Sequence, residues 1–481
     1  MAKDFIVAIE LGSAKLTGIA GKKNPDGSIS VLAVASEDST SYIRKGVVNS
    51  IDKTAQGLSN IITKLKNTLQ ADITQVYVGI GGRSIHSVKN MVIKDLPTDT
   101  IVSQGMVNEL MDTNRNMTYP DYEIQDAITE EYKVGLQYQT DPVGIQANRL
   151  EGNFLNVLWR RLYFRSLNKS FDSAGIAIAE TYLAPIVMAD NVLTEAEKRA
   201  GCVLVDLGAQ TTTVSVYYRD RLRNIAVIPL GGYNITKDLE SLPMQSAEAE
   251  RMKLKYGSAL TDVADIDPKA VLKIDDTRTV ELPVFIDIVE ARMLEIIENV
   301  KAFIPSEYSD KLLGGIILTG GGSNMKNVEK AFRETLGIDK VRTAKFASIN
   351  ISKDSIVELP HDGTMNTILS LLARGDMNCA GNPFSDSLFS KDDYADPAAI
   401  SSDPARTAAG VQTTPRETEE QRRQRLQKEE EERLQKEQKQ KEEEERVRRE
   451  EEERKKNSPF HRLFGTLKQF GRSLVEPENN D

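Results

Sequence analysis

The sequence predicts an α/β fold over about residues 4–375, followed by a tail of different composition. Three observations predict it. Short runs rich in aliphatic and β-branched residues alternate with helical stretches and glycine turns, a strand–turn–strand unit occurs twice, and the composition changes sharply after this part of the chain. The chain has 481 residues, 40% of them hydrophobic, which is enough for about two to four domains.

The charge and cysteine content argue against several classes of protein. A net charge of −10 disfavours a nucleic-acid-binding protein, which usually presents a basic face. The 2 cysteines and 3 histidines suit neither a disulfide framework nor a zinc site, and they favour a reducing compartment. Residues 1–4 lead directly into a strand-like run without a secretory signal, and no apolar run reaches the ~20 residues that span a bilayer. We therefore expect a cytoplasmic protein with peripheral membrane contact.

The strongest internal signal is a repeated strand–turn–strand unit. The run from Val7 to Ala20 is echoed by the run from Leu204 to Val216. In each, an apolar strand ends in a carboxylate, an apolar residue and a glycine, and a short turn leads into a second strand. A P-loop or a dinucleotide-binding loop leads from a strand into a helix, so this order disfavours both.

Such a hairpin suits a phosphate group, because glycine allows close approach and turn amides and hydroxyls can donate to phosphate oxygens. Two hairpins that face one another would clamp a polyphosphate, and the carboxylates of Glu10 and Asp206 would then hold Mg²⁺ through water. The competing interpretation is a pair of ordinary β-hairpins with turn glycines. The residues expected around the phosphates are Glu10, Gly12, Ser13, Ala14, Lys15, Asp206, Gly208 and Thr211.

A third glycine-rich element lies farther along the chain. An apolar strand from Gly314 to Thr319 runs into Gly320, Gly321 and Gly322, and residues 325–332 then have a helical pattern. Backbone without side chains would let a base or ribose pack closely. An ordinary strand-to-helix loop is the alternative.

In this order, the three elements resemble the phosphate-1, phosphate-2 and adenosine motifs of the actin/Hsp70/sugar-kinase superfamily. Within it, the chain resembles the FtsA family of actin-like bacterial cell-division proteins over about residues 4–375 and in the terminal helix. The resemblance rests on residues 9–15, 192–195, 205–208 and 318–321, with Gly79–Arg83 before an insertion and residues 183–185 and 364–370 in two connecting helices.

The resemblance implies a two-lobed actin-like ATPase fold with RNase H-like cores around a cleft for ATP. It also implies an inserted subdomain, 1C, a linker and a terminal helix. The expected divisions are residues 1–83 (subdomain 1A, first part), 84–171 (1C), 172–200 (1A, second part), 201–230 (2A, first part), 231–312 (2B), 313–375 (end of 2A and return to 1A), 376–457 (disordered and charged linker) and 458–476 (amphipathic membrane-targeting helix).

Two details bear on nucleotide chemistry. Glu250 and Lys253 match a family Glu-x-x-Lys that contacts ribose and base, and their spacing places both on one helix face; a surface salt bridge is the alternative. The family's second loop usually reads Gly-Gly-Gly-Thr-Thr-Asp, whereas residues 208–213 here read Gly-Ala-Gln-Thr-Thr-Thr. A positive φ at Gln210 would be costly. We expect ATP binding with at most weak hydrolysis.

The tail divides into a spacer and a terminal helix. Residues 382–416 are rich in small and polar residues, and residues 417–456 are almost entirely charged or Gln without the apolar seam of a coiled coil. We expect the charged tract to be disordered or a lone helix. In the final helix, apolar residues fall on one arc and basic residues lie off it, as in a helix lying on an anionic membrane surface. The expected membrane residues are Phe460, Leu463, Phe464, Leu467, Phe470, Leu474, Arg462, Lys468 and Arg472.

A helix that docks on the protein's own core or in a partner's groove would show the same apolar stripe. The preceding hydrophilic spacer and the family resemblance favour the membrane.

The resemblance implies a structural function. An FtsA-like protein polymerises, anchors the tubulin-like protein FtsZ to the inner face of the cytoplasmic membrane at the septum, and recruits later division proteins. Residues 288–292 resemble the family motif that binds the FtsZ tail, and Arg292 would pair with that acidic tail; an ordinary solvated arginine is the alternative. The competing functions are a small-molecule kinase or other ATPase of the superfamily, an Hsp70-like chaperone and a pilus assembly protein. A kinase needs a catalytic base, for which the sequence offers no separate candidate.

Overall fold

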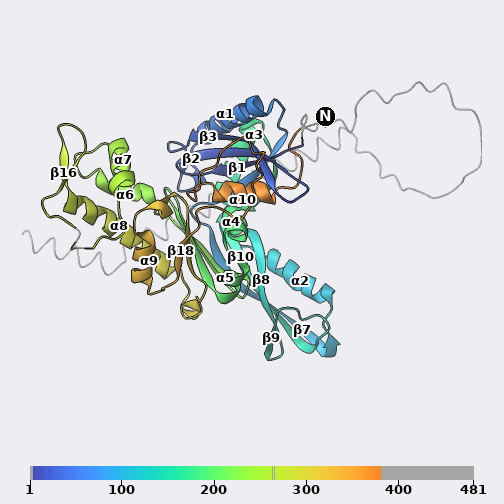
Figure 1. The fold of residues 1–481 in the computed structure, drawn as a ribbon. Coiled ribbons are helices and arrows are strands. Elements are labelled where there is room, and N and C mark those ends of the chain that lie inside the picture. The colour runs from blue at the N-terminus through green and yellow to red at the C-terminus, as the bar shows by residue number, and fades with distance from the viewer. Residues whose placement is uncertain (1–3, 263, 265, 381–481) are drawn as a thin grey trace, which may run out of the picture. The chain divides into compact units, whose positions relative to one another are not determined.

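The computed structural model describes residues 4–262, 264 and 266–380 (Figure 1). The predicted helix 458–476, its membrane residues and residues 381–457 of the predicted linker lie outside the described residues. None of the helices in the described part of the chain is long and apolar enough to cross a membrane.

The first lobe is built on a five-stranded sheet with the strand order β11-β6-β1-β2-β3. Strands β1, β2 and β3 form an antiparallel meander, and β6 and β11 add to β1 in parallel. The strands are β1 (Ile6–Leu11), β2 (Lys15–Lys23), β3 (Ile29–Asp38), β6 (Gln75–Ile80) and β11 (Ala177–Leu183), with the short pair β4 (Ile43–Arg44) and β5 (Val47–Val48) beside them. The first predicted hairpin is therefore confirmed.

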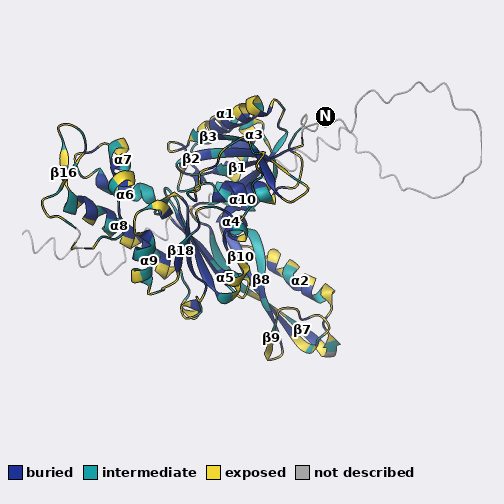
Figure 2. Ribbon diagram, viewed as in Figure 1, coloured by how far each residue is buried: buried dark blue, intermediate teal, exposed yellow. Residues whose placement is uncertain are grey.

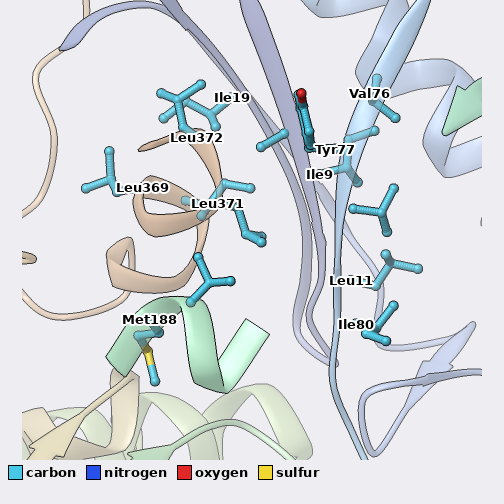
Figure 3. Close-up of a cluster of buried hydrophobic side chains, with 14 of the residues drawn as sticks. Ile9, Leu11, Ile19, Val76, Tyr77, Ile80, Met188, Leu369, Leu371 and Leu372 are labelled. Atoms are coloured by element: carbon cyan, nitrogen blue, oxygen red, sulfur yellow. The ribbon is translucent and has the colours of Figure 1, made fainter. Parts of the chain in front are cut away.

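Glycines bring helices close to both faces of this sheet. Gly18 and Gly21 on β2 differ by an odd number of positions, so they face opposite sides. A Cβ at Gly18 would lie 2.5 Å from Ile61, and a Cβ at Gly21 would lie 2.8 Å from Leu372. The covering helices are α1 (Ile51–Leu69) and α3 (Arg161–Ala174) on one side and α4 (Ala184–Val192) and α10 (Asn366–Arg374) on the other. Figure 3 shows α10 leucines packed over β1 and β6, with Met188 of α4 below them.

The second lobe repeats the same strand pattern. Strands β12, β13 and β14 form an antiparallel meander, and β17 and β18 add to β12 in parallel. These strands are β12 (Cys202–Leu207), β13 (Thr212–Tyr218), β14 (Arg221–Ile228), β17 (Gly315–Thr319) and β18 (Val341–Thr343). The second predicted hairpin is confirmed as well, and it occupies the place in its sheet that the first occupies in the other.

Alternate residues of β12 serve two hydrophobic cores, as the twofold period of a strand requires. Cys202 and Leu204 pack in the core of the first lobe, whereas Val203 and Val205 pack in the core of the second. Figure 2 shows that burial is concentrated on the strands, while α1 and α2 expose their outer faces.

Helices and one hairpin complete the second lobe. Helices α6, α7 and α8 pack together beside the β15–β16 hairpin (Figure 1). The elements are α5 (Glu195–Ala200), α6 (Gly232–Leu239), α7 (Ser246–Tyr256), β15 (Val271–Lys273), β16 (Thr279–Glu281), α8 (Leu282–Ala302), a 3-10 turn η2 (Ser306–Tyr308), a second 3-10 turn η3 (Gly321–Asn324) and α9 (Val328–Leu336). The helical pattern predicted for residues 325–332 is realised from Val328 onward, after η3 and a three-residue connection.

The inserted segment continues the second sheet. Its strands β7 (His86–Ile101), β10 (Gln146–Arg160), β8 (Tyr122–Val134) and β9 (Gln137–Gln139) follow β14 in a nine-stranded order, and His86 pairs with Ala226 at the junction. Helix α2 (Gln104–Arg115) covers one face with a small core of its own. Helix α3, most of which falls in the range 84–171 predicted for the insertion, packs against α1 of the first lobe. The subdomain boundaries stay a prediction.

Candidate functional site

A cavity of about 1350 Å³ is lined by residues of both lobes. Each of the three glycine-bearing elements and helix α7 contribute to its wall. The sequence-predicted residues on the wall are Ala14, Lys15, Gly208, Glu250, Lys253, Gly321 and Gly322. The two hairpin turns, separated by almost 200 residues in sequence, therefore open on one space, as the clamp hypothesis requires.

The glycines that begin the two turns are needed by the turns themselves. A Cβ at Gly12 would lie 2.6 Å from the carbonyl oxygen of Lys15, and a Cβ at Gly208 would lie 2.9 Å from that of Thr211. The amide of Gly208 also donates to the Thr211 carbonyl at 2.9 Å. Any side chain at either position would thus open the hairpin. This adds a structural requirement to the close phosphate approach that the sequence suggested.

Donor groups of both turns point to an anion. In the described part of the chain, the backbone N–H groups of Ala14 and Ala209 make no hydrogen bond, although both residues line the cavity. Lys15 is exposed at the cavity wall and forms no ion pair with the other described residues. Unpaired amides beside a free cation are the groups that hold phosphate oxygens in proteins.

Two carbonyls of the second turn are bound by the start of α6. Gly208 and Ala209 accept hydrogen bonds from the amides of Gly232, at 3.0 Å, and Tyr233, at 2.6 Å. A Cβ at Gly231 would lie 2.6 Å from the Gly208 carbonyl oxygen. The start of α6 is therefore seated on the turn. Sequence reasoning missed this contact, although the Gly231–Gly232 pair before a helical pattern was a signal for it.

The two hydroxyls predicted as phosphate donors do not line the cavity. Ser13 is buried, and its Oγ accepts a hydrogen bond from the Gly46 amide at 2.7 Å. Thr211 is half-buried beside the turn. Gln210 does not adopt a positive φ, so the strain that this would have brought does not arise.

Glu10 and Asp206 are the second-to-last residues of β1 and β12, and neither lines the cavity. Burial, followed by the negative charge of Asp206, raises the pKa of Glu10 to about 8. Burial raises the pKa of Asp206 to about 6. Neither carboxylate forms an ion pair with another described residue, and two buried carboxylates that interact electrostatically fit a hydrated divalent cation.

The third loop packs on Asp206. Gly320 has φ +79°, and a Cβ there would lie 2.3 Å from Oδ1 of Asp206 and 2.8 Å from the carbonyl oxygen of Leu207. A Cβ at Gly322 would lie 2.9 Å from the Cβ of Leu207 and 3.0 Å from its carbonyl oxygen. At Gly321 the nearest atom, on Thr364, is 3.7 Å away, so this glycine alone leaves free space toward the cavity. Gly320 and Gly322 are thus required by packing.

Glu250 and Lys253 form an anchored pair. Lys253 is only 8% exposed and its Nζ donates to Glu250 at 2.7 Å, to Oγ1 of Thr236 at 3.0 Å and to the carbonyl of Gly232 at 3.0 Å. Thr236 donates to the same Glu250 carboxylate. The pair ties α7 to α6 and, through Gly232, to the second turn, so it is not a solvated surface salt bridge.

Known proteins match this chain in both lobes and in the insertion. The model of "Cell division protein FtsA" matches residues 203–360, and the model of "SHS2 domain inserted in FTSA" matches residues 82–158. A cell division protein FtsA from Porphyromonas gingivalis is 30% identical over 359 residues, which cover 73% of this chain and 74% of that protein. The chain belongs to the FtsA family. The FtsA of Neisseria meningitidis is 29% identical, over 72% of this chain and 88% of its own length.

A solved structure agrees on the fold. The PilM-PilN type IV pilus biogenesis complex superposes with a TM-score of 0.53 at 15% identity, over 77% of this chain and 98% of that one. At this identity the likeness concerns the fold alone. The fold is the two-lobed actin-like α/β fold predicted from the sequence, with the SHS2 domain of FtsA inserted.

Arg292, which was predicted from the sequence resemblance to pair with an acidic partner, lies on α8. Its guanidinium makes two hydrogen bonds to Asp238, at 2.6 and 3.0 Å, and contacts Glu295. These partners, with Asp238 first, hold the pKa of Arg292 above its usual range. An acidic partner would have to exchange with Asp238 or share the guanidinium with it.

Proposed function

We propose that this FtsA-family chain binds ATP between its lobes, polymerises, and tethers FtsZ filaments to the inner face of the cytoplasmic membrane at the division septum. The observation that carries the proposal is the shared cavity, on which Ala14 and Lys15 of one lobe and Gly208 and Ala209 of the other open together. The match to cell division proteins over most of the chain supports the cellular role.

In this proposal the two turns hold the triphosphate. The free amides of Ala14 and Ala209 and the ammonium group of Lys15 donate to its oxygens from opposite sides. Gly321 leaves room for the nucleoside, and Glu250 on α7 reaches its ribose. Mg²⁺, when bound, neutralises phosphate charge, and Glu10 and Asp206 would hold it through water as the sequence suggested.

Hydrolysis is proposed to be weak. The family's acidic residue at the end of the second loop is replaced by Thr213, which is buried in β13 opposite Asp206 in the ladder. A hydroxyl in that place cannot act as a carboxylate base at neutral pH. ATP would then serve mainly to stabilise one arrangement of the lobes for assembly.

Attachment is proposed to depend on polymerisation. A single amphipathic helix, as predicted for residues 458–476, would bind a membrane weakly and reversibly, and a filament would present many copies at once. Arg292 on α8 is proposed to bind the acidic FtsZ tail in exchange for Asp238. Self-assembly, the FtsZ tail, later division proteins and the anionic membrane surface are thus the proposed partners.

The test is sedimentation of the full chain with vesicles of anionic and neutral phospholipid, with and without ATP and Mg²⁺. We expect ATP to increase the vesicle-bound fraction, and an FtsZ tail peptide to sediment with it. Phe464→Glu with Leu467→Glu should release the chain from vesicles while ATP binding is retained, and Leu136→Glu, on an exposed hairpin, is the matched control. Unchanged sedimentation of the double variant would refute the membrane role.

A further inference from the structure

A two-residue turn of the first lobe is held by both hairpin loops. Lys45 and Gly46 both adopt left-handed backbone conformations, with φ +53° and +71°. The amide of Gly46 donates to Oγ of Ser13 in the first loop at 2.7 Å. The amide of Lys45 donates to Oε1 of Gln210 in the second loop at 2.9 Å. Adjacent amides of one turn are thus bound by side chains from opposite lobes.

The turn itself is fixed against the start of the inserted domain. A Cβ at Gly46 would lie 2.5 Å from the Cα of Gly82, so the two glycine backbones are in direct contact. The amide of Arg83 donates to the Lys45 carbonyl at 2.8 Å. The Lys45–Gly46 turn therefore offers Gln210 a rigid anchor.

Gln210 is placed to connect the second loop to the first lobe and not to bind a ligand. It does not line the cavity, whereas its neighbours Gly208 and Ala209 do. Its backbone is not in the left-handed region, so the loop carries its long side chain without strain. A glycine at this position would have no atom to reach the Lys45 amide.

We propose that Gln210 is a positioning residue that latches the second loop to the first lobe before nucleotide binds. The loop is then pinned on both sides, to α6 through its carbonyls and to the Lys45–Gly46 turn through Gln210. The free amides of Ala14 and Ala209 are held at a set separation across the cavity. The benefit to nucleotide rests on the proposed function, whereas the latch itself does not.

Amide hydrogen exchange of the nucleotide-free full chain tests the latch at single-residue resolution. Gln210→Ala should speed exchange at Lys45 by roughly fivefold, the loss expected for one neutral hydrogen bond, and leave Gly46 protected. Ser13→Ala should have the converse effect. Gln210→Glu keeps an acceptor and should preserve protection at Lys45. Gln137→Ala, at an exposed strand position, should alter neither amide.

The hydrogen bond from Lys45 to Gln210 and its benefit to nucleotide binding are tested by different outcomes. Equal exchange at Lys45 in the wild type and Gln210→Ala overturns the latch, whatever the chain does with ATP. Faster exchange at Lys45 with ATP affinity reduced severalfold supports the latch as a positioning device. Faster exchange with unchanged ATP affinity overturns the positioning role, and a wild type that binds no ATP refutes the proposed function while leaving the exchange result intact.

Discussion

Replacing Glu10 by Gln should make the nucleotide-free chain more stable. In the folded chain the pKa of Glu10 is raised from 4.5 to about 8, first by burial and then by the charge of Asp206. Between these two values the folded state binds more protons than the unfolded state, so stability falls as pH rises through this window. A neutral glutamine at this position does not titrate and removes that loss.

The size of the effect follows from the shift. Each pKa unit corresponds to about 1.4 kcal/mol, so the gain for Glu10→Gln should be about 1 kcal/mol at pH 5 and about 4 kcal/mol at pH 8. The same substitution removes a proposed ligand of hydrated Mg²⁺. Greater stability and a smaller effect of Mg²⁺ on ATP affinity should therefore appear together, as at other sites where function opposes stability.

Urea denaturation of the full chain in EDTA at pH 5 and pH 8 measures the difference. Glu197→Gln is the control, because this substitution should lower the stability where Glu10→Gln raises it. Burial would raise the pKa of Glu197, but hydrogen bonds from Arg342 and Thr194 outweigh burial and lower it to about 2. Its loss should destabilise by up to about 3 kcal/mol. A Glu10→Gln variant that is less stable than the wild type, or whose gain does not grow with pH, would show that the buried charge of Glu10 does not destabilise the fold.

Two further substitutions test packing at the cavity. Gly320→Ala should destabilise by about 2–5 kcal/mol, because strain at positive φ adds to a collision with Asp206 and Leu207, whereas Gly27→Ala, at φ +81° with nothing within 4 Å, should cost only about 1–2 kcal/mol. Equal denaturation midpoints for the two would contradict this. Lys253→Met keeps most of the aliphatic chain but removes the donor to three acceptors, on Gly232, Thr236 and Glu250. It should lower the free energy of unfolding by about 2 kcal/mol. Lys53→Met, at an exposed position of α1, should lose almost none.

The parts of the fold that could be predicted are those determined by a local sequence pattern. Val7–Ala20 and Leu204–Val216 repeat one strand–turn–strand pattern, and both form the same hairpin at equivalent places in two sheets. Glu10 and Asp206 could be matched to each other from the sequence because each is the second-to-last residue of the first strand of its hairpin. The glycine-rich loop after β17 was visible for the same reason.

Contacts between distant segments were not predictable. The hydrogen bond from Lys45 to Gln210 joins residues 165 positions apart and depends on the closure of the lobes, which no local periodicity records. Ser13 carries a hydroxyl in a phosphate-type turn, and only the fold reveals that this oxygen accepts a hydrogen bond from the amide of Gly46. The pairing of His86 with Ala226, which merges the insertion with the second sheet, likewise has no sequence pattern of its own.

Calorimetric titration of ATP with Mg²⁺ into charge variants of the two loops tests the shared site most directly. Ala14→Glu and Ala209→Glu each place a carboxylate on the cavity wall, one from each lobe, and Leu136→Glu adds the same charge at a residue that is 93% exposed on the insertion. We predict one site in the wild type, an affinity at least about tenfold weaker in each loop variant, and an unchanged affinity in Leu136→Glu. Unchanged binding in either loop variant would contradict a nucleotide held by both lobes.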